Sequence, residues 1–487
     1  MTFIMEELDI ALIKKRSITG VFSLVSRTFI IQIIGQLVSL LLTIYLTKGD
    51  YGLFFLVSNV IVFLGYFSDI GLAAALIQKK EEVTPEDLKT TFTIQQGLVT
   101  FLVLLGLGIS PWVAKVYSLD IIGTHLYQAL LIAFFLSSLK TIPSILLERR
   151  LEFSKLVIPE IVETILFNVT VLVLAIKGFG VQSFIYAVLL RGISGLIVIY
   201  IISPWKLQIG FSKSSAKKLL AFGLPFQANS FLALIKDNVL ILYLGAILSK
   251  ESLGFIGVAQ KWAFLPLRLV MDNVIRITFP SFSRMAGHPE TLGKAIEKTL
   301  FAIALLIFPS VTGLVILMPH FMTIFPKYQK WEPALFSLIF FGFNAVFSSI
   351  STPLTNALNA IGKIKVTLGL MVFWTVATWI LTPLLVMWYG FNGVAMASAL
   401  VSASVVGVVI IIKKYIQFTI LPLVIPPFVA TVVMGVSLLF LSPLITNFFM
   451  FFGVILLAGG IYAGMIMLIA RQAVLSDIQL IRENLKK

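Results

Sequence analysis

The sequence predicts an all-α polytopic membrane protein with about 14 transmembrane helices, arranged as two six-helix lobes plus two extra helices. Three observations lead to this fold class. The chain has 487 residues, of which 59% are hydrophobic and only 12% charged, and its mean hydropathy is +1.03. Apolar runs of about 20 residues, the length that crosses a bilayer, recur from end to end. Landmarks in the first half return in the second about 200 residues later, which indicates an internal repeat.

Turn and charge signals separate the apolar runs and so define the spans. A typical start is Thr84-Pro85-Glu86-Asp87, where a capping hydroxyl precedes a proline and two acids that suit the positive end of a helix. In chain order the predicted spans are 18–47, 53–78, 91–117, 125–147, 157–176, 180–202, 219–247, 254–280, 295–319, 333–360, 366–389, 393–412, 420–443 and 448–470. Residues 1–17 are predicted as an interfacial amphipathic segment, and residues 471–487 as a cytoplasmic tail.

The distribution of Lys and Arg orients these spans. With the N-terminus in the cytoplasm, the even-numbered loops and both termini hold 24 of the 37 basic residues, and the opposite side holds 6. Cytoplasmic loops of membrane proteins are rich in Lys and Arg, so we expect both termini in the cytoplasm and the protein in the cytoplasmic (inner) membrane. The same rule accounts for the net charge of +15 without a nucleic-acid partner.

The internal repeat divides the chain into lobes. Asp69 corresponds to Asp272 at an offset of 203 residues, and the offset drifts to 213 for Gly180 and Gly393. A six-helix period leaves both halves with the same orientation, so the lobes should be related by an axis along the membrane normal. The predicted parts are an N-lobe at 18–202, a cytoplasmic linker at 203–218, a C-lobe at 219–414 and helices 13 and 14 at 415–470.

Ionisable residues inside spans are costly in lipid and are therefore functional candidates. The clear in-span acids are Asp69, Asp237 and Asp272, and we assign them to an ion-coupling or gate network; the in-span bases are Arg27, Lys140, Arg191, Lys236, Lys261, Arg268 and Arg276. Five of these bases, Arg27, Lys236, Lys261, Arg268 and Arg276, are assigned to a site for an anionic substrate.

Structural interpretations of the same charges stay open. Snorkelling to the inner interface is an alternative for Arg27 and is favoured for Lys140. Asp69 either carries a coupling ion, caps its helix or pairs with Lys140. Pairing with Glu163 is favoured for Arg191, whereas Lys236 and Asp237 project about 100° apart and need not pair.

The eighth span carries the densest set of charges. On a straight helix Lys261, Arg268, Asp272 and Arg276 fall within an arc of roughly 80°, a stripe that cannot face lipid. Either Asp272 and the arginines form a structural network, or the stripe lines a cavity, and the two are compatible. Two arginines around one acid leave one net positive charge, which suits bidentate phosphate binding. Pro266 permits a kink in this span.

Several kinds of chemistry are excluded. The chain has no cysteine, and its three histidines are widely spaced, so we expect no metal site and no cofactor. The segment GHPETLGKA at 287–295 fails as a phosphate loop, because Ala295 stands where a magnesium-binding hydroxyl is needed. The outer loops are too short for the catalytic site of a polysaccharide polymerase or ligase. We therefore predict that the protein is not an enzyme.

Five stretches, in order along the chain, resemble one known family. They are YGLFFLVSNVIVFLGYFSDIGLAAALIQKKEEVTPEDLKTTF (51–92), ILLERRLEFSKL (145–156), SPWKLQIGFSKSSAKKLLAFGLP (203–225), FLPLRLVMDN (264–273) and FPSFSRM (279–285). Together they resemble the Wzx-like flippases that export O-antigen, capsule, exopolysaccharide and teichuronic-acid repeat units. The resemblance covers roughly residues 20–365 and continues beyond by hydropathy alone.

The resemblance implies a function. Such proteins move oligosaccharides on polyprenyl diphosphate from the inner to the outer leaflet, coupled to an ion gradient of H+ or Na+, by alternating access. It implies Arg27, Arg268 and Arg276 as contacts of the diphosphate, membrane lipids as surroundings, and a polysaccharide polymerase and glycosyltransferases as partners. The alternatives are a cation-coupled multidrug exporter, a lipid II flippase and, from another class, a polysaccharide polymerase or ligase. A multidrug exporter of cations should have an acidic cavity, whereas the in-span bases here outnumber the clear acids.

Overall fold

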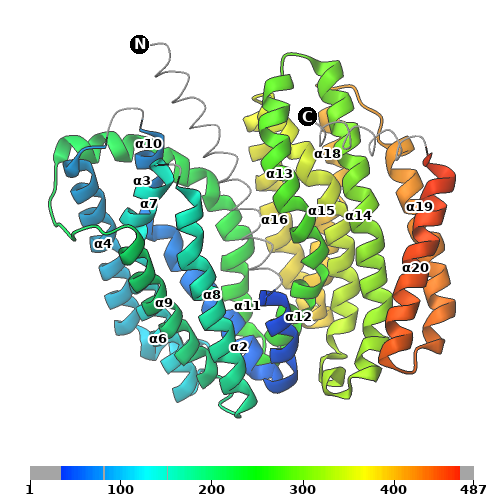
Figure 1. Ribbon diagram of the computed structural model, residues 1–487, viewed down its shortest axis with the longest axis horizontal. Coiled ribbons are helices and arrows are strands. Elements are labelled where there is room, and N and C mark those ends of the chain that lie inside the picture. Colours follow the sequence, from blue (N-terminus) through cyan, green and yellow to red (C-terminus); the bar gives the residue numbers. More distant parts are fainter. Residues whose placement is uncertain (1–33, 80–82, 151, 472–487) are drawn as a thin grey trace. The chain divides into compact units, whose positions relative to one another are not determined.

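The computed structural model describes residues 34–79, 83–150 and 152–471, and within them it leaves undescribed the side chains of residues 69, 78, 222, 224–230, 272–273, 276–277 and 279–280. Helices make up nearly all of this described part, which holds no strand (Figure 1). The all-α fold class predicted from the sequence is confirmed. The chain divides into two compact units, Met1–Gly254 and Phe255–Lys487.

The first unit contains the short apolar helix Ile34–Tyr45 and the helices that follow it. These are α2 (Lys48–Asp69), α3 (Leu72–Gln78), α4 (Pro85–Gly108), α5 (Ser110–Val116), α6 (Ile121–Ser138), α7 (Thr141–Arg149), α8 (Phe153–Ile176), α9 (Gln182–Ile202), α10 (Lys213–Leu234), the π-helical turn η1 (Ile235–Val239) and α11 (Leu240–Ile247). Helix α12 (Lys250–Ala263) crosses the boundary between the units.

The second unit continues with longer helices. They are α13 (Leu265–Met285), α14 (Pro289–Ile324), the 3-10 turn η2 (Pro326–Trp331), α15 (Ala334–Ala360), α16 (Ile364–Tyr389), α17 (Asn392–Ser402), α18 (Val405–Lys413), α19 (Leu421–Leu441), the 3-10 turn η3 (Ser442–Leu444) and α20 (Phe448–Ile469). Helices α19 and α20 are the predicted spans 13 and 14, and α19 packs against α14.

The described residues provide 11 helices that are long and apolar enough to cross a membrane, or 12 if α12 and α13 form one bent span. The other two predicted spans do not meet this measure. Span 18–47 lies only partly in the described residues, and span 219–247 is divided among α10, η1 and α11. The π-helical turn η1 interrupts the predicted span 219–247, so no single α-helix covers it.

Helices at corresponding positions of the predicted repeat have corresponding packing partners within each unit. In the first unit α8 packs on α9, α6 on α9, α4 on α6 and α2 on α6. In the second unit the corresponding helices pair in the same way: α16 with α17, α15 with α17, α14 with α15 and α13 with α15. Equivalent neighbours in the two halves are what an internal six-helix repeat produces.

The first unit bends sharply between α2 and α3. Ile70 and Gly71 both have left-handed backbone conformations, with φ of 44° and 79°. A Cβ atom on Gly71 would lie 2.3 Å from the carbonyl oxygen of Gly223, so the backbones of this bend and of α10 touch directly. The bend therefore requires glycine at position 71, both for its conformation and for lack of space.

The sequence also singles out Gly460 and Gly464 as a helix-packing motif. A Cβ atom at either position would have no neighbour within 4 Å, so the motif makes no close helix contact within the described part of the chain.

Candidate functional site

The predicted site residues are distributed over several helices, and the structure describes four of their side chains. Arg27 lies outside the described residues. Asp69 ends α2, while Asp272 and Arg276 belong to α13, and the side chains of all three lie outside the described part. Their assignments stay predictions. The described side chains are those of Lys236, Asp237, Lys261 and Arg268.

Lys236 and Asp237 form an ion pair in η1, with 3.1 Å between Lys236 Nζ and Asp237 Oδ1. The expectation that they need not pair assumed α-helical geometry. The π-helical turn changes the spacing of adjacent side chains, and such turns are frequent at functional sites. The Asp237 side chain is 62% exposed. An exposed carboxylate at this point of a predicted span indicates contact with water rather than lipid.

Asn238, also in η1, contacts Asn59 of α2, and this contact was not predicted. Asn238 Nδ2 donates to Asn59 Oδ1 at 3.0 Å, and Asn59 Nδ2 donates to the carbonyl oxygen of Phe55 at 2.7 Å. About two helical turns from these asparagines, the ring of Tyr66 lies beside that of Phe231, with 5.9 Å between the ring centroids. The presence of asparagine within an apolar run was the available signal, but it does not identify a partner 179 residues away.

These contacts give the first unit a surface that joins α2 to α10 and η1. We define the α2–η1 surface as Asn59, Tyr66, Phe231, Asp237 and Asn238. Phe231 is 42% exposed, and the other members combine an amide pair, a phenol and a carboxylate. Aromatic faces beside amide and carboxylate groups can bind polar ligands that also carry apolar faces.

Lys261 and Arg268 lie on different helices. Helix α12 ends at Ala263 and α13 starts at Leu265, and the two are bent by 44°. The kink permitted by Pro266 is therefore present. The predicted 80° arc of charged residues assumed a straight helix, so Lys261 on α12 does not belong to it. Arg268 is exposed, whereas the apolar residues of α13 pack into a core with α14 and α15: Leu267, Val270, Met271, Val274 and Ile275.

A buried charge cluster lies elsewhere in the first unit. Glu163 of α8 is 7% exposed. It accepts a hydrogen bond from Lys140 Nζ at 2.5 Å and forms an ion pair with Arg191 Nε at 3.5 Å. The predicted pairing of Arg191 with Glu163 is confirmed. The prediction that Lys140 snorkels to the interface is wrong, because a buried carboxylate is within reach. The alternative pairing of Lys140 with Asp69 stays a prediction, because the Asp69 side chain lies outside the described residues.

Gly195 of α9 makes room for this cluster. A Cβ atom there would overlap Glu163 Oε1 at 1.7 Å. The guanidinium of Arg191 lies over the ring of Phe167 at 5.8 Å, and the Arg191 side chain is 54% exposed. The described members of the cluster, Glu163, Lys140 and Arg191, are one acid and two bases.

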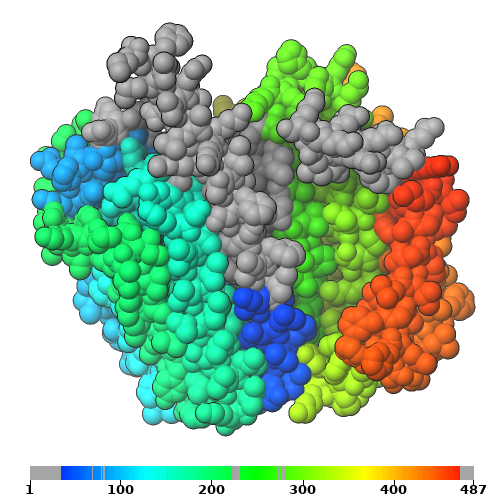
Figure 2. All heavy atoms as spheres, in the orientation of Figure 1, coloured from blue at the N-terminus to red at the C-terminus, as the bar shows by residue number. Residues whose placement is uncertain are grey.

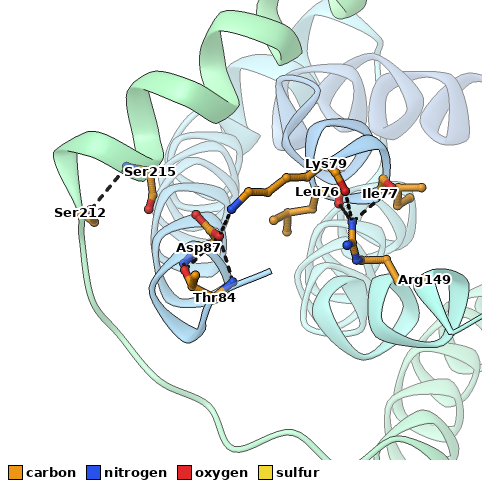
Figure 3. A network of polar contacts seen from close by, with 8 residues as sticks. All are labelled: Leu76, Ile77, Lys79, Thr84, Asp87, Arg149, Ser212 and Ser215. Atoms are coloured by element: carbon orange, nitrogen blue, oxygen red, sulfur yellow. Dashed lines mark hydrogen bonds and ion pairs between the residues drawn. The ribbon is translucent and has the colours of Figure 1, made fainter. Parts of the chain in front are cut away.

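A network of polar contacts, separate from the Glu163 cluster, joins the end of α3 to the start of α4 (Figure 3). Arg149 Nη1 donates to the carbonyl oxygens of Leu76 at 2.6 Å, Ile77 at 3.3 Å and Lys79 at 2.9 Å. These carbonyls lie at the end of α3 and lack helical partners, so Arg149 satisfies them and complements the negative end of the helix.

Asp87 forms the other half of the network. Its side chain is 6% exposed, pairs with Lys79 at 2.6 Å and forms a capping box with Thr84. The sequence predicted the capping hydroxyl of Thr84 but not the reciprocal bond from Asp87. Figure 3 shows Ser215 of α10 beside it. Lys79, directly after α3, is therefore held between α4 and α7.

We expect Arg149→Ala to lower the free energy of unfolding by about 1.5–3 kcal/mol, the usual contribution of a hydrogen bond to a charged group. The measurement is denaturant unfolding of the purified protein in detergent. Arg150→Ala, which removes an exposed neighbouring arginine, is the matched control. Equal effects of the two substitutions would contradict a capping role for Arg149.

The second unit has a surface hollow of about 510 Å³. Its lining combines the loop that fails as a phosphate loop with the segment after α18: Gly287, His288, Pro289, Glu290, Thr291, Tyr415 and Gln417. Most of these side chains are exposed, and Glu290 disfavours an anionic ligand. We assign no chemistry to it.

Comparison with known proteins adds to this geometry. A family model described as polysaccharide biosynthesis protein matches residues 41–336, which include the α2–η1 surface, both networks, Lys261 and Arg268. Lipopolysaccharide biosynthesis protein WzxC of Escherichia coli K12 is 24% identical over 380 residues, or 74% of each chain. Succinoglycan biosynthesis transport protein ExoT of Rhizobium meliloti is 21% identical over 273 residues, about half of either chain (55% and 54%).

The fold also resembles a solved structure. The lipid II flippase MurJ, in an inward closed conformation, matches with a TM-score of 0.71 over 93% of this chain and 99% of its own. At 17% identity, this likeness concerns the fold alone.

Proposed function

Because the chain belongs to the family of polysaccharide biosynthesis proteins, we propose that it carries lipid-linked oligosaccharides across the cytoplasmic membrane for the assembly of a surface polysaccharide. The cargo would be an oligosaccharide repeat unit on polyprenyl diphosphate, moved from the inner to the outer leaflet. The family match is the observation that carries this proposal, and the name of ExoT, a transport protein, agrees with it. The chain is a multi-pass membrane protein, and its relatives favour transport over catalysis.

The charges suggest how the cargo would be held. A diphosphate needs cationic donors away from lipid, and Arg268, Arg276 and Lys261 follow one another along the predicted eighth span. The remaining assigned contacts are Arg27 and Lys236. The pair of Lys236 with Asp237 leaves the carboxylate exposed, so we place Asp237 with Asp69 and Asp272 in the network that couples transport to H+ or Na+.

Other parts of the proposal concern the surroundings of the protein. Both termini would lie in the cytoplasm, as the distribution of Lys and Arg indicates. A polymerase and glycosyltransferases would act on the same lipid-linked intermediate after and before its transport. The alternative functions are export of drugs and flipping of lipid II.

Translocation in proteoliposomes tests the proposal. The purified protein would be reconstituted with a polyprenyl-diphosphate oligosaccharide, and a glycan-modifying reagent that cannot cross the membrane would report the leaflet of the cargo. We expect wild-type protein to move the cargo. A cationic dye under a pH gradient and lipid II serve as competing cargoes. Movement of either one without movement of the oligosaccharide would overturn the proposal.

In the same assay we expect Arg268→Ala/Arg276→Ala to slow translocation by roughly 100-fold or more. Each substitution removes charge-assisted hydrogen bonds to the diphosphate that contribute about 1.5–3 kcal/mol. Arg284→Ala, near the end of the same helix, is the control for loss of a positive charge. An unchanged rate in the double variant would remove these arginines from the diphosphate site. Thermal unfolding of each variant separates loss of transport from loss of fold.

A further inference from the structure

The segment between α9 and α10 exposes a row of large apolar side chains. Leu207, Ile209 and Phe211 are 57%, 85% and 66% exposed. They alternate with Lys206, Gln208 and Gly210 in a stretch without helical structure. In water such a row is unfavourable, so its exposure indicates contact with another apolar phase.

Hydrogen bonds fix the depth of this segment. The backbone N–H groups of Gly210 and Ser212 donate to the hydroxyls of Thr93 and Thr90 of α4, both at 2.9 Å. Thr93 follows Pro85, the first residue of α4, by eight positions, so it lies about 12 Å along the helix at 1.5 Å per residue. The segment therefore runs beside the first turns of a membrane-spanning helix and not beyond its end.

The figures show the same placement. In Figure 1 the segment is an open loop at the rim of the first unit, leading to the start of α10. Figure 2 shows the green atoms of this part of the chain at the edge of the unit. On its inner side Trp205 packs edge-on against Phe92, with 5.0 Å between ring centroids, and Ser203 Oγ donates to the carbonyl oxygen of Pro143 at 3.3 Å.

The backbone of the segment excludes a position in the hydrocarbon core. An irregular chain exposed to lipid would leave its peptide groups without partners, at a cost of several kcal/mol each. The boundary between headgroups and acyl chains provides both water for the backbone and apolar contact for the side chains. Interfacial segments place their apolar face about 5–10 Å into this boundary, a depth consistent with the pairing to Thr90 and Thr93.

The charges around the segment identify the kind of lipid. Residues 203–218 contain four lysines, all exposed, and no acid: Lys206, Lys213, Lys217 and Lys218. The side chain of Lys89 packs beside Gly210. Of the two acids in the first turn of α4, Asp87 is buried and paired with Lys79, and Glu86 is exposed. Among the described residues of this surface lysines outnumber exposed acids, and this excess of positive charge complements anionic headgroups.

We propose that residues 204–218 form an interfacial anchor that binds anionic phospholipids. Leu207, Ile209 and Phe211 enter the acyl boundary of the leaflet, and the four lysines hold the phosphate-bearing headgroups above them. The anchor fixes the segment that leads into α10, where the bend at Gly71 makes its backbone contact. This interaction is independent of the cargo that the protein transports.

Single cysteines test the insertion, since the chain has no cysteine of its own. Spin labels at Leu207→Cys, Ile209→Cys and Phe211→Cys would be studied in vesicles of phosphatidylcholine and phosphatidylglycerol. We expect these labels to be accessible to oxygen and shielded from an aqueous nickel chelate. Gln208→Cys, in the alternate position, should be more accessible to the chelate. Equal access of the chelate to all four positions would overturn the insertion and favour a soluble protein partner.

Lipid-attached quenchers test the choice of lipid. A fluorophore at Ile209→Cys would be quenched by brominated phosphatidylglycerol or brominated phosphatidylcholine, and the ratio gives the relative binding of the two lipids. We expect preference for phosphatidylglycerol. Lys217→Gln/Lys218→Gln should reduce it by up to roughly 30-fold, the factor that corresponds to about 1 kcal/mol per lysine near an anionic surface. Lys327→Gln/Lys330→Gln, which removes two lysines from η2, should leave the ratio unchanged. Equal quenching by both lipids in the wild-type protein would overturn the anionic preference.

Discussion

Replacing Glu163 by alanine is expected to lower the free energy of unfolding by about 3–5 kcal/mol, because it leaves the largely buried base Lys140 without this carboxylate. Lys140 is 16% exposed and lies 2.5 Å from Glu163, so it loses its charge partner inside the helix bundle. Arg191 loses a weaker contact at 3.5 Å and keeps its position over Phe167. The midpoint of denaturant unfolding in detergent measures the effect.

The chain contains a matched control for this experiment. Glu152 and Lys155 form an ion pair at 3.1 Å, with Lys155 54% exposed. Surface pairs of this kind contribute about 0–1 kcal/mol, so Glu152→Ala should have little effect. Similar losses in both variants would show that burial of Glu163 does not determine its contribution.

A double variant separates loss of the pair from loss of packing. Lys140→Met/Glu163→Leu replaces two charges by apolar groups, and buried pairs replaced in this way often retain stability. We expect it to recover most of the loss caused by Glu163→Ala. Gly195→Ala approaches the cluster from α9, since its new methyl group would overlap the carboxylate. It should destabilise the wild-type protein and have less effect where Glu163 is already alanine.

The sequence predicts the helices of this fold better than the contacts between their charges. Apolar runs, capping residues and the Lys/Arg distribution are local properties, and they identify the class and most of the spans. The pairing of Glu163 with Arg191 could be predicted because α8 and α9 are consecutive helices. Lys140 was misassigned because its distance from the helix end suggested a route to water, and the sequence does not show the carboxylate that faces it.

The eighth span illustrates a second limit. Pro266 indicates a kink, but the direction and size of the bend depend on how Phe264 and the apolar face of α13 pack. The bend lies before α13, so the helical spacing within α13 still applies to Arg268, Asp272 and Arg276. Lys261 belongs to α12 and not to this helix. Likewise, η1 places Lys236 beside Asp237 because a π-helical turn alters a spacing that sequence periodicity assumes to be constant.

Long-range polar contacts were outside what a single sequence can supply. Arg149 counts as one of many basic residues in the predicted inner loops, and its role depends on the end of α3 lying within hydrogen-bond distance. The linker at 203–218 was predicted as a cytoplasmic connection. Its apolar row becomes meaningful only when Thr90 and Thr93 fix the segment beside a spanning helix.

The contact between Gly71 and Gly223 leads to the other large prediction. Gly71→Ala is expected to lower the free energy of unfolding by about 2–5 kcal/mol, since a left-handed conformation costs a residue with Cβ about 1–2 kcal/mol and overpacking adds about 1–3 kcal/mol. The new methyl group would lie 2.3 Å from a backbone oxygen, which cannot rotate away as a side chain would. Thermal and denaturant unfolding measure the loss.

Substitutions at two further glycines separate the steric contribution to this loss of stability from the contribution of the left-handed conformation. Gly223→Ala enters the same contact from α10, with Cβ 2.7 Å from the carbonyl oxygen of Ile70, but needs no left-handed conformation. It should therefore show the steric part alone and a smaller loss than Gly71→Ala. Gly97→Ala, in the interior of α4, meets no atom within 4 Å and should be neutral or stabilising by up to about 1 kcal/mol. If Gly71→Ala behaved like Gly97→Ala, the bend would be able to move away from α10, and direct backbone contact would not be what holds α3 in place.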